Sequence, residues 1–155
     1  ERIKKINEQS LSTNNEEEKL AKDTKSTTEP PKEHDVKWFM NENGQGGWNS
    51  LHFAIYFGHV NVVKLLLSHG ADPLMTSNDD WTPLQLAVYK ENLEIVDLLL
   101  KLNSSQVNHL TSKGSALHIA AKRGYPHLAK LLLEKGADLN LKNSDEVTPL
   151  EIATD

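Results

Sequence analysis

The C-terminal two-thirds of the sequence repeats itself every 33 residues. Leucines recur at this step as Leu51, Leu84, Leu117 and Leu150, and alanines recur as Ala54, Ala87, Ala120 and Ala153. A second block, an apolar residue, a charged residue and three leucines, begins at Val63, Val96 and Ala129. A fixed period of this length is typical of stacked repeat units. We therefore expect a solenoid rather than helices wrapped around one central core.

Each unit carries the start and stop signals of helices. The leucine–alanine segment follows a residue type that caps helix N-termini, namely Asn49, Thr82, Ser115 or Thr148. Pro83 and Pro149 stand at the first helical position, where a missing N–H costs nothing. After the leucines, Gly70, Asn103 and Gly136 are equivalent, and both residue types tolerate the left-handed conformation that ends helices. We predict a short helix, a tight turn, a second helix and a hairpin-like loop.

The second helix is apolar on nearly every side in residues 62–67 and 98–100. A helix of that kind must be covered on several faces. Neighbouring units supply the cover, and the small alanines at positions 54, 87 and 120 let adjacent helices approach closely. The sequence thus predicts an all-α repeat solenoid whose stability is a sum of units and interfaces.

These residues resemble the ankyrin repeat family. The resemblance is carried by Thr-Pro-Leu-x-x-Ala, a Gly58-His59 turn, the leucine run, and Gly-Ala-Asp at 70–72 and 136–138. It covers about residues 47–155 and implies helix-turn-helix units with β-hairpin-like loops. The units are expected at 47–79, 80–112, 113–145 and, truncated, 146–155. Such a truncated unit would leave an apolar face of the third unit poorly covered, unless a continuation or another chain covers it.

Some positions depart from the family pattern. Gln85 and Glu151 stand where His52 and His118 occupy the Leu-His position of other units. The loop 103–113 fits worst, and we expect a distorted hairpin there. For the two Leu-His imidazoles we expect a hydrogen bond to a nearby loop rather than metal ligation.

The segment before the repeats has a different composition. Within the first 35 residues the apolar side chains are Ile3, Ile6, Leu11, Leu20 and Ala21. Such a stretch buries too little apolar area to offset its ordering entropy, so residues 1–34 are interpreted as a polar linker. A thin apolar stripe in its first 22 residues makes partial helix the alternative. Residues 35–46 are interpreted as a degenerate N-terminal cap that lays Trp38, Phe39 or Met40 on the first unit.

Composition and motifs argue against several functions. The chain has no Cys, a net charge of −5, and apolar runs far shorter than the roughly 20 residues that cross a bilayer. No nucleophile elbow, phosphate-binding glycine loop or paired His motif occurs. We expect no enzyme activity, no cofactor, no metal, no nucleic acid and no membrane insertion. We also expect an intracellular, cytoplasmic location and, from the absence of Met at residue 1, a segment of a longer polypeptide.

Aromatic and basic residues recur at the hairpins and at the ends of the first helices. In ankyrin proteins these two places form the exposed inner surface where partners dock, and aromatic and Arg side chains dominate interface energetics. The predicted partner-binding residues are Trp48, Tyr56, Phe57, Asp79, Trp81, Tyr89, Lys90, Lys113, Lys122 and Arg123. The alternative is that each Trp merely packs on its neighbouring hairpin and the Tyr hydroxyls contact solvent.

The sequence therefore predicts a non-catalytic module that binds a partner protein through hairpin tips and the concave first-helix face. The alternative is an intramolecular regulatory or spacer stack, attached to an enzymatic or an acyl-CoA- or lipid-binding domain outside this segment. Leu132, Asp138 and Asn140 also have a spacing that resembles ankyrin sites of asparagine hydroxylation. Because ankyrin hairpins often carry this spacing, we interpret Asn140 as structural, with modification as the secondary hypothesis.

Overall fold

The computed structural model describes residues 41–42 and 44–154. Seven α-helices lie in this part of the chain: α3 (Ser50–Tyr56), α4 (Val60–Ser68), α5 (Pro83–Tyr89), α6 (Leu93–Leu102), α7 (Ala116–Arg123), α8 (Pro126–Glu134) and α9 (Pro149–Thr154). Two 3-10 helices accompany them, η1 (Gln45–Gly47) and η2 (Ser104–Asn108). The predicted linker at 1–34, its partial helix, and Trp38, Phe39 and Met40 lie outside the described residues.

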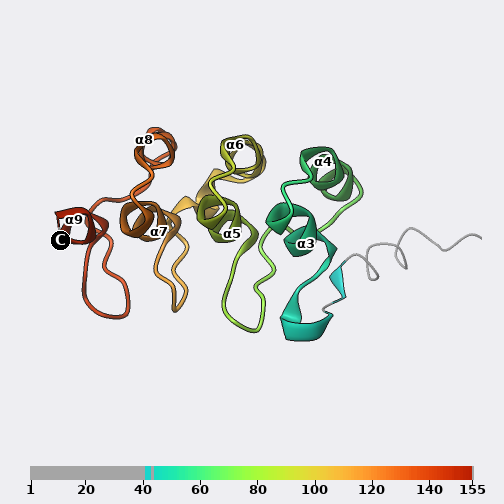
Figure 1. Cartoon of the computed structure of the whole chain (residues 1–155), viewed down its shortest axis with the longest axis horizontal. Helices are drawn as coiled ribbons and strands as arrows, with labels where there is room; N and C mark the ends of the chain where they lie inside the picture. The colour runs from blue at the N-terminus through green and yellow to red at the C-terminus, as the bar shows by residue number, and fades with distance from the viewer. Residues whose placement is uncertain (1–40, 43, 155) are drawn as a thin grey trace, which may run out of the picture. The chain divides into compact units, whose positions relative to one another are not determined.

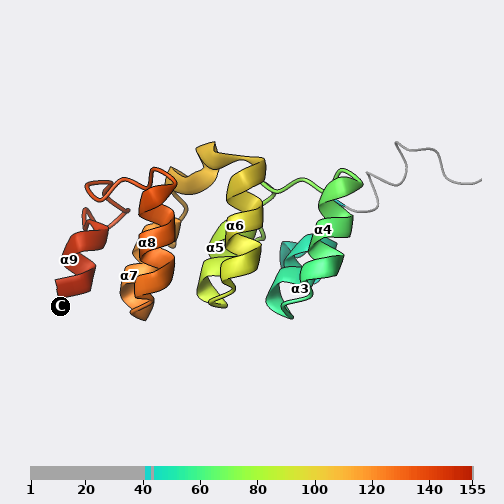
Figure 2. The same cartoon turned by 90° about the horizontal axis from the view of Figure 1, so that it is seen from above.

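The helices form two rows. The first helices of the units, α3, α5, α7 and α9, stand side by side, and α4, α6 and α8 form a second row beside them (Figure 1). The long loops all project from the first-helix row, and the view from above shows the helices running nearly parallel (Figure 2). The predicted all-α repeat solenoid is confirmed.

The repeated leucines and alanines of the first three units are buried in the core, whereas Leu150 and Ala153 of the fourth unit are exposed. Leu51, Leu84 and Leu117 are buried, as are Ala87 and Ala120 of the alanine position. The second helices are covered unevenly, which corrects one expectation. In α4 only Val63 is fully buried, while Val62 and Leu65 are exposed, because the side of α4 away from α3 faces solvent. Although α4 has apolar residues on nearly every side, other elements do not cover every side of it.

The predicted caps form. The side chains of Asn49, Thr82 and Ser115 accept hydrogen bonds from the backbone N–H three residues later, each within a reciprocal capping box. Gly70 and Gly136 both have φ of +92°, as the stop signal predicts. Asn103 is a correction: its φ is −151°, in the extended region. Its Oδ1 accepts hydrogen bonds from the Ser105 backbone and hydroxyl, so the chain starts η2 instead of a left-handed turn.

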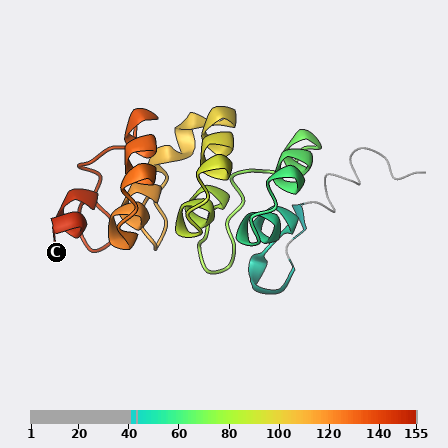
Figure 3. The ribbon, with the colours of Figure 1, turned by 45° about the horizontal axis from the view of Figure 1, so that its top comes forward.

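The predicted distortion of the second hairpin is confirmed. In the regular loops the turn is closed by a hydrogen bond across four residues, Ser77 N to Trp81 O and Asn143 N to Val147 O, both 3.0 Å. In the second loop the equivalent bond, Thr111 N to Gly114 O, spans three residues at 3.2 Å. The second turn is therefore one residue shorter than the others. η2, seen between α6 and α8 in Figure 3, accommodates the extra residue, so the 33-residue repeat is kept.

Candidate functional site

Two repeated aromatic pairs lie where the hairpins meet the first helices. The Trp48 ring lies edge-on to Tyr56 with centroids 5.3 Å apart, and Trp81 lies edge-on to Tyr89 at 5.0 Å. Both Trp rings and Tyr89 are half-buried against the core, whereas Tyr56 is 39% exposed. Each Trp therefore packs on its own unit and still presents part of its ring to solvent.

Cations from the following unit lie over these rings. Lys90 Nζ is 4.1 Å from the centroid of Tyr56, and Arg123 Cζ is 4.0 Å from that of Tyr89. Lys113 Nζ lies 5.4 Å from the centroid of Trp81. These distances are within the range of attractive cation–π contacts. We call the set formed by Trp48, Tyr56, Trp81, Tyr89, Lys90, Lys113 and Arg123 the aromatic–cation strip.

The other predicted site residues lie around the strip. Phe57 is 64% exposed and its ring contacts Tyr56 edge-on with centroids 5.3 Å apart. Lys122, at the end of α7, is exposed. Asp79 is exposed at a hairpin tip and makes no described ion pair or hydrogen bond with the strip. Of the ten predicted residues, seven fall into two contact groups: Trp48, Tyr56 and Lys90 form one, and Trp81, Tyr89, Lys113 and Arg123 form the other.

One end of the strip opens into a cavity of about 610 Å³. Trp81 and Tyr89 line it together with the cationic side chains of Lys113, Lys122 and Arg123. Ile119, Val147 and Ile152 add apolar surface, so residues of three consecutive units contribute. Volumes of this size are typical of sites that hold a small molecule or a side chain.

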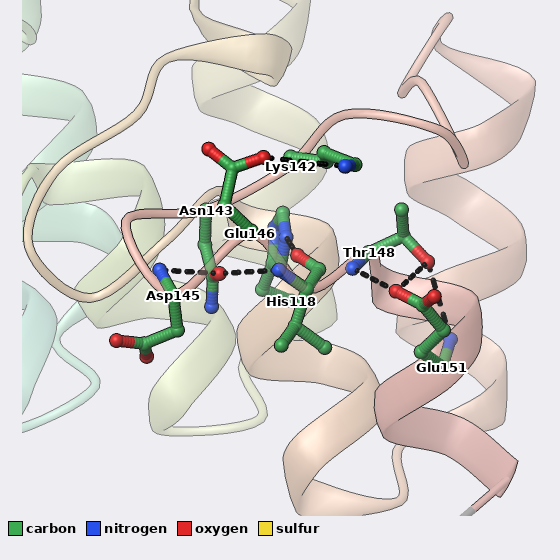
Figure 4. Close-up of polar contacts among 8 residues, drawn as sticks. His118, Lys142, Asn143, Asp145, Glu146, Thr148 and Glu151 are labelled. Atoms are coloured by element: carbon green, nitrogen blue, oxygen red, sulfur yellow. Dashed lines mark hydrogen bonds and ion pairs between the residues drawn. The ribbon is translucent and has the colours of Figure 1, made fainter.

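A buried set of side chains ties each hairpin to the next. His52 Nε2 lies 3.0 Å from the carbonyl oxygen of Trp81, and His118 Nε2 lies 3.0 Å from that of Val147 (Figure 4). The opposite ring nitrogens, Nδ1, lie 2.8 Å from Asn49 Oδ1 and 2.7 Å from Ser115 Oγ. The predicted hydrogen bonds from the Leu-His imidazoles to nearby loops are confirmed.

Gln85 performs the same task, which sequence reasoning missed. Its Nε2 donates to the Gly114 carbonyl at 2.7 Å, and its Oε1 accepts from the Thr82 backbone N–H at 3.2 Å. An amide can replace imidazole here because each group carries a donor and an acceptor that point in different directions. His52, Gln85 and His118 are called the inter-unit ladder below.

The ladder is structural in its chemistry. Burial removes water from the His52 ring and lowers its pKa, partly opposed by the hydrogen bond to the Trp81 carbonyl. Among the residues that the structure describes, no three His, Asp or Glu side chains gather as a metal site would require. In α9, hydrogen bonds from the backbone and hydroxyl of Thr148 lower the pKa of Glu151 (Figure 4).

Asparagines make a second link between units. Asn108 Nδ2 donates to the Gly136 carbonyl at 3.0 Å, and its Oδ1 accepts from Asp138 N at 2.8 Å. Asn41 makes the same pair of bonds to Gly70 and Asp72. Asn140, which is exposed, stands seven residues before Val147, just as Asn41 stands seven residues before Trp48. Asn108, which makes the link, stands only six residues before the equivalent hairpin residue Gly114, so no fixed spacing in the sequence marks this link.

Comparison with known proteins places the repeat in a family. The family described as "Ankyrin repeats (3 copies)" matches residues 30–111, and the one described as "Ankyrin repeats (many copies)" matches residues 98–153. The first match alone spans more than half of the chain. The chain belongs to the ankyrin repeat family. Ankyrin repeats are in general non-catalytic protein-interaction modules.

Its relatives are larger ankyrin-repeat proteins. The chain is 49% identical over 49 residues to mouse protein phosphatase 1 regulatory subunit 12A, covering 32% of this chain and 5% of that protein. It is 40% identical over 108 residues to the mouse B-cell lymphoma 3 protein homolog, and 42% identical over 108 residues to bovine ankyrin repeat and SOCS box protein 3. Each 108-residue match covers 69% of this chain but only 24% and 21% of those proteins.

Within the described residues, no helix combines the length and apolar character needed to cross a bilayer.

Proposed function

We propose that this ankyrin stack is a non-catalytic recognition module that binds a partner protein through its hairpins and the face of its first helices. The observation that carries the proposal is the aromatic–cation strip, in which half-exposed rings are held in place by cations of the next unit. Preordered aromatic and Arg side chains lose little entropy on binding, so they contribute strongly to affinity.

The outer row of helices supports the choice of face. Lys64 of α4 pairs with Glu94 of α6 at 2.8 Å, and Lys135 pairs with Asp97 of α6 at 3.6 Å. On that side, charged groups of neighbouring units are already matched to each other. The strip instead presents Trp and Tyr rings together with Arg123, and these are residue types enriched in interface centres.

The test compares two matched pairs of substitutions. The strip-side variant carries Phe57→Ser and Lys122→Ser, both at exposed side chains next to the strip. The control carries Leu65→Ser and Lys130→Ser, on α4 and α8 of the outer row. Each pair removes one exposed apolar group and one Lys, so solubility and net charge change equally.

Both variants and the wild-type chain are immobilised in equal amounts and incubated with an extract of the cells that make the protein. We expect at least one protein to be retained by the wild type and by the control, and reduced about fivefold or more on the strip-side variant. Thermal unfolding of all three chains checks that the folds are equally stable. Loss of the same bound proteins from the control alone would refute the proposed face.

A stack that regulates a domain of its own polypeptide remains the second candidate. In that case no retained protein is lost selectively from the strip-side variant. When added in trans to the full-length polypeptide, the wild-type stack competes for the regulated domain and the strip-side variant does not.

A further inference from the structure

Three cations of the cavity have no acidic partner among the described side chains. Lys113, Lys122 and Arg123 line it, and none is within ion-pairing distance of a described carboxylate. By contrast, Lys64, Lys101, Lys135 and Lys142 each pair with one. Asp145 is the one acidic residue in the cavity lining, so cationic groups are in excess there although the chain as a whole carries a net charge of −5.

Two of these cations are already positioned. The Arg123 guanidinium lies 4.0 Å from the centre of the Tyr89 ring, and Lys113 Nζ lies 5.4 Å from that of Trp81. A guanidinium against a ring keeps N–H groups at its edge for a carboxylate. Because the aromatic contacts restrict the two side chains beforehand, less conformational entropy is lost when an anion binds.

The remaining lining is apolar. Ile119, Val147 and Ile152 join the rings of Trp81 and Tyr89 around a volume of about 610 Å³. A small free anion would use the cations but leave this apolar surface in water. A peptide that carries an apolar side chain next to carboxylates uses both, and burial of the apolar group adds to the binding free energy.

Resting on the proposed function, we propose that this cavity binds an acidic peptide segment of the partner. A bulky apolar side chain of that segment fills the space beside Ile119 and Ile152, and carboxylates on either side of it pair with Lys113, Lys122 and Arg123. The cations give the site its preference for acidic over neutral apolar segments.

The experiment begins with a library of random displayed peptides of about a dozen residues. The library is selected on the whole wild-type chain and, in parallel, on Lys122→Glu. Lys122 makes no described ring contact, so this substitution reverses a charge in the cavity without removing a cation–π pair. Lys130→Glu, an equal change of charge on α8, is the matched control. The sequence most enriched on the wild type is synthesised with a fluorophore, and binding is followed by anisotropy.

We expect the enriched sequences to contain at least two Asp or Glu residues around a Leu, Ile or Phe. Lys122→Glu should weaken binding about tenfold, and Lys130→Glu by less than about twofold. Exchanging the Asp and Glu residues of the peptide for Asn and Gln, or its apolar residue for Ser, should each weaken binding about tenfold. Raising the salt from about 50 to about 300 mM should weaken it severalfold.

The competing occupants give different outcomes. If the Ser-containing peptide binds as well as its parent and inorganic phosphate displaces both, the site is a simple anion site and the inference is wrong. It is also wrong if a single-stranded oligonucleotide binds more tightly than the peptide, if the enriched sequences are neutral or basic, or if none is enriched.

The result also separates this inference from the proposed function. Peptides that are insensitive to Lys122→Glu but lose affinity on Phe57→Ser leave the proposed binding face intact and refute only the acidic-segment site. Peptides that lose affinity only on Leu65→Ser and Lys130→Ser refute both.

Discussion

The inter-unit ladder and the aromatic–cation strip repeat with the same 33-residue period, yet they differ in burial and in contacts. His52, Gln85 and His118 are essentially inaccessible to solvent, and each bonds the next hairpin. Tyr56 and Phe57 of the strip side are exposed. A fixed register therefore carries two kinds of residue at once, those that join units and those that face outward.

The substitutions between units show what constrains the ladder and what constrains the strip. Between the three buried ladder positions the change is from His to Gln, which keeps a hydrogen-bond donor aimed at the next loop. Glu151, at the same position of the fourth unit, is exposed and accepts from the Thr148 backbone N–H of its own unit. At the equivalent positions one unit later, Gly114 and Lys122 stand in place of Trp81 and Tyr89, whose side chains make no hydrogen bond among the described residues. Buried polar groups must be satisfied, whereas solvent compensates for changes at an exposed position.

The largest effect is expected from His118→Ala. The substitution removes a buried ring and leaves the Val147 carbonyl and the Ser115 hydroxyl without their partner. We expect the free energy of unfolding to fall by about 3 kcal/mol, measured by urea denaturation at neutral pH. His118→Gln, which copies Gln85, should recover most of this loss.

A loss below about 1 kcal/mol for His118→Ala would break the comparison, because the ladder would then contribute no more than an exposed contact. Lys122→Ala serves as the exposed control in the same helix, with an expected change within about 0.5 kcal/mol.

A smaller effect is expected for Tyr89→Ala. The ring makes an edge-on contact with Trp81 and holds Arg123, but it is only half-buried. We expect a loss of about 1–2 kcal/mol in the free energy of unfolding, with a single cooperative transition retained. A double-mutant cycle with Arg123→Ala should give a coupling energy of about 0.5–1 kcal/mol. Collapse of the fold would show that the ring belongs to the core.

The smallest effect concerns pH and His52. Because burial lowers the pKa of His52 from 6.5, the unfolded chain takes up a proton at this ring before the folded chain does. Its contribution to stability is therefore complete above about pH 6.5 and is lost as the pH falls from there toward the folded-state pKa.

We expect His52→Gln to change the free energy of unfolding by less than about 1 kcal/mol at pH 7.5 and to flatten its decline between pH 7.5 and 5.5. Urea denaturation at both pH values, on the variant and the wild type, provides the measurement. An equally steep decline in the variant would mean that other groups control the acid response.

The sequence predicted the positions of the aromatic residues in the site but not their contacts with the cations. The hairpin and helix-end positions of Trp48, Tyr56, Trp81 and Tyr89 followed from the period. That Lys90 and Arg123 lie over rings of the preceding unit did not follow, since these partners are more than 30 residues apart along the chain. The left-handed helix end predicted at Asn103 was wrong because its side chain accepts a local hydrogen bond from Ser105 N, which favours an extended backbone.

By itself the sequence determined the helices, their caps and the fact that units stack, because these depend on local residue types repeated at a fixed step. Only the tertiary structure decided which repeated polar residues are buried, which cations lie over which rings, and that a cavity opens beside Lys122. Those properties depend on distances between side chains of successive units, and such distances are set by how the helices pack.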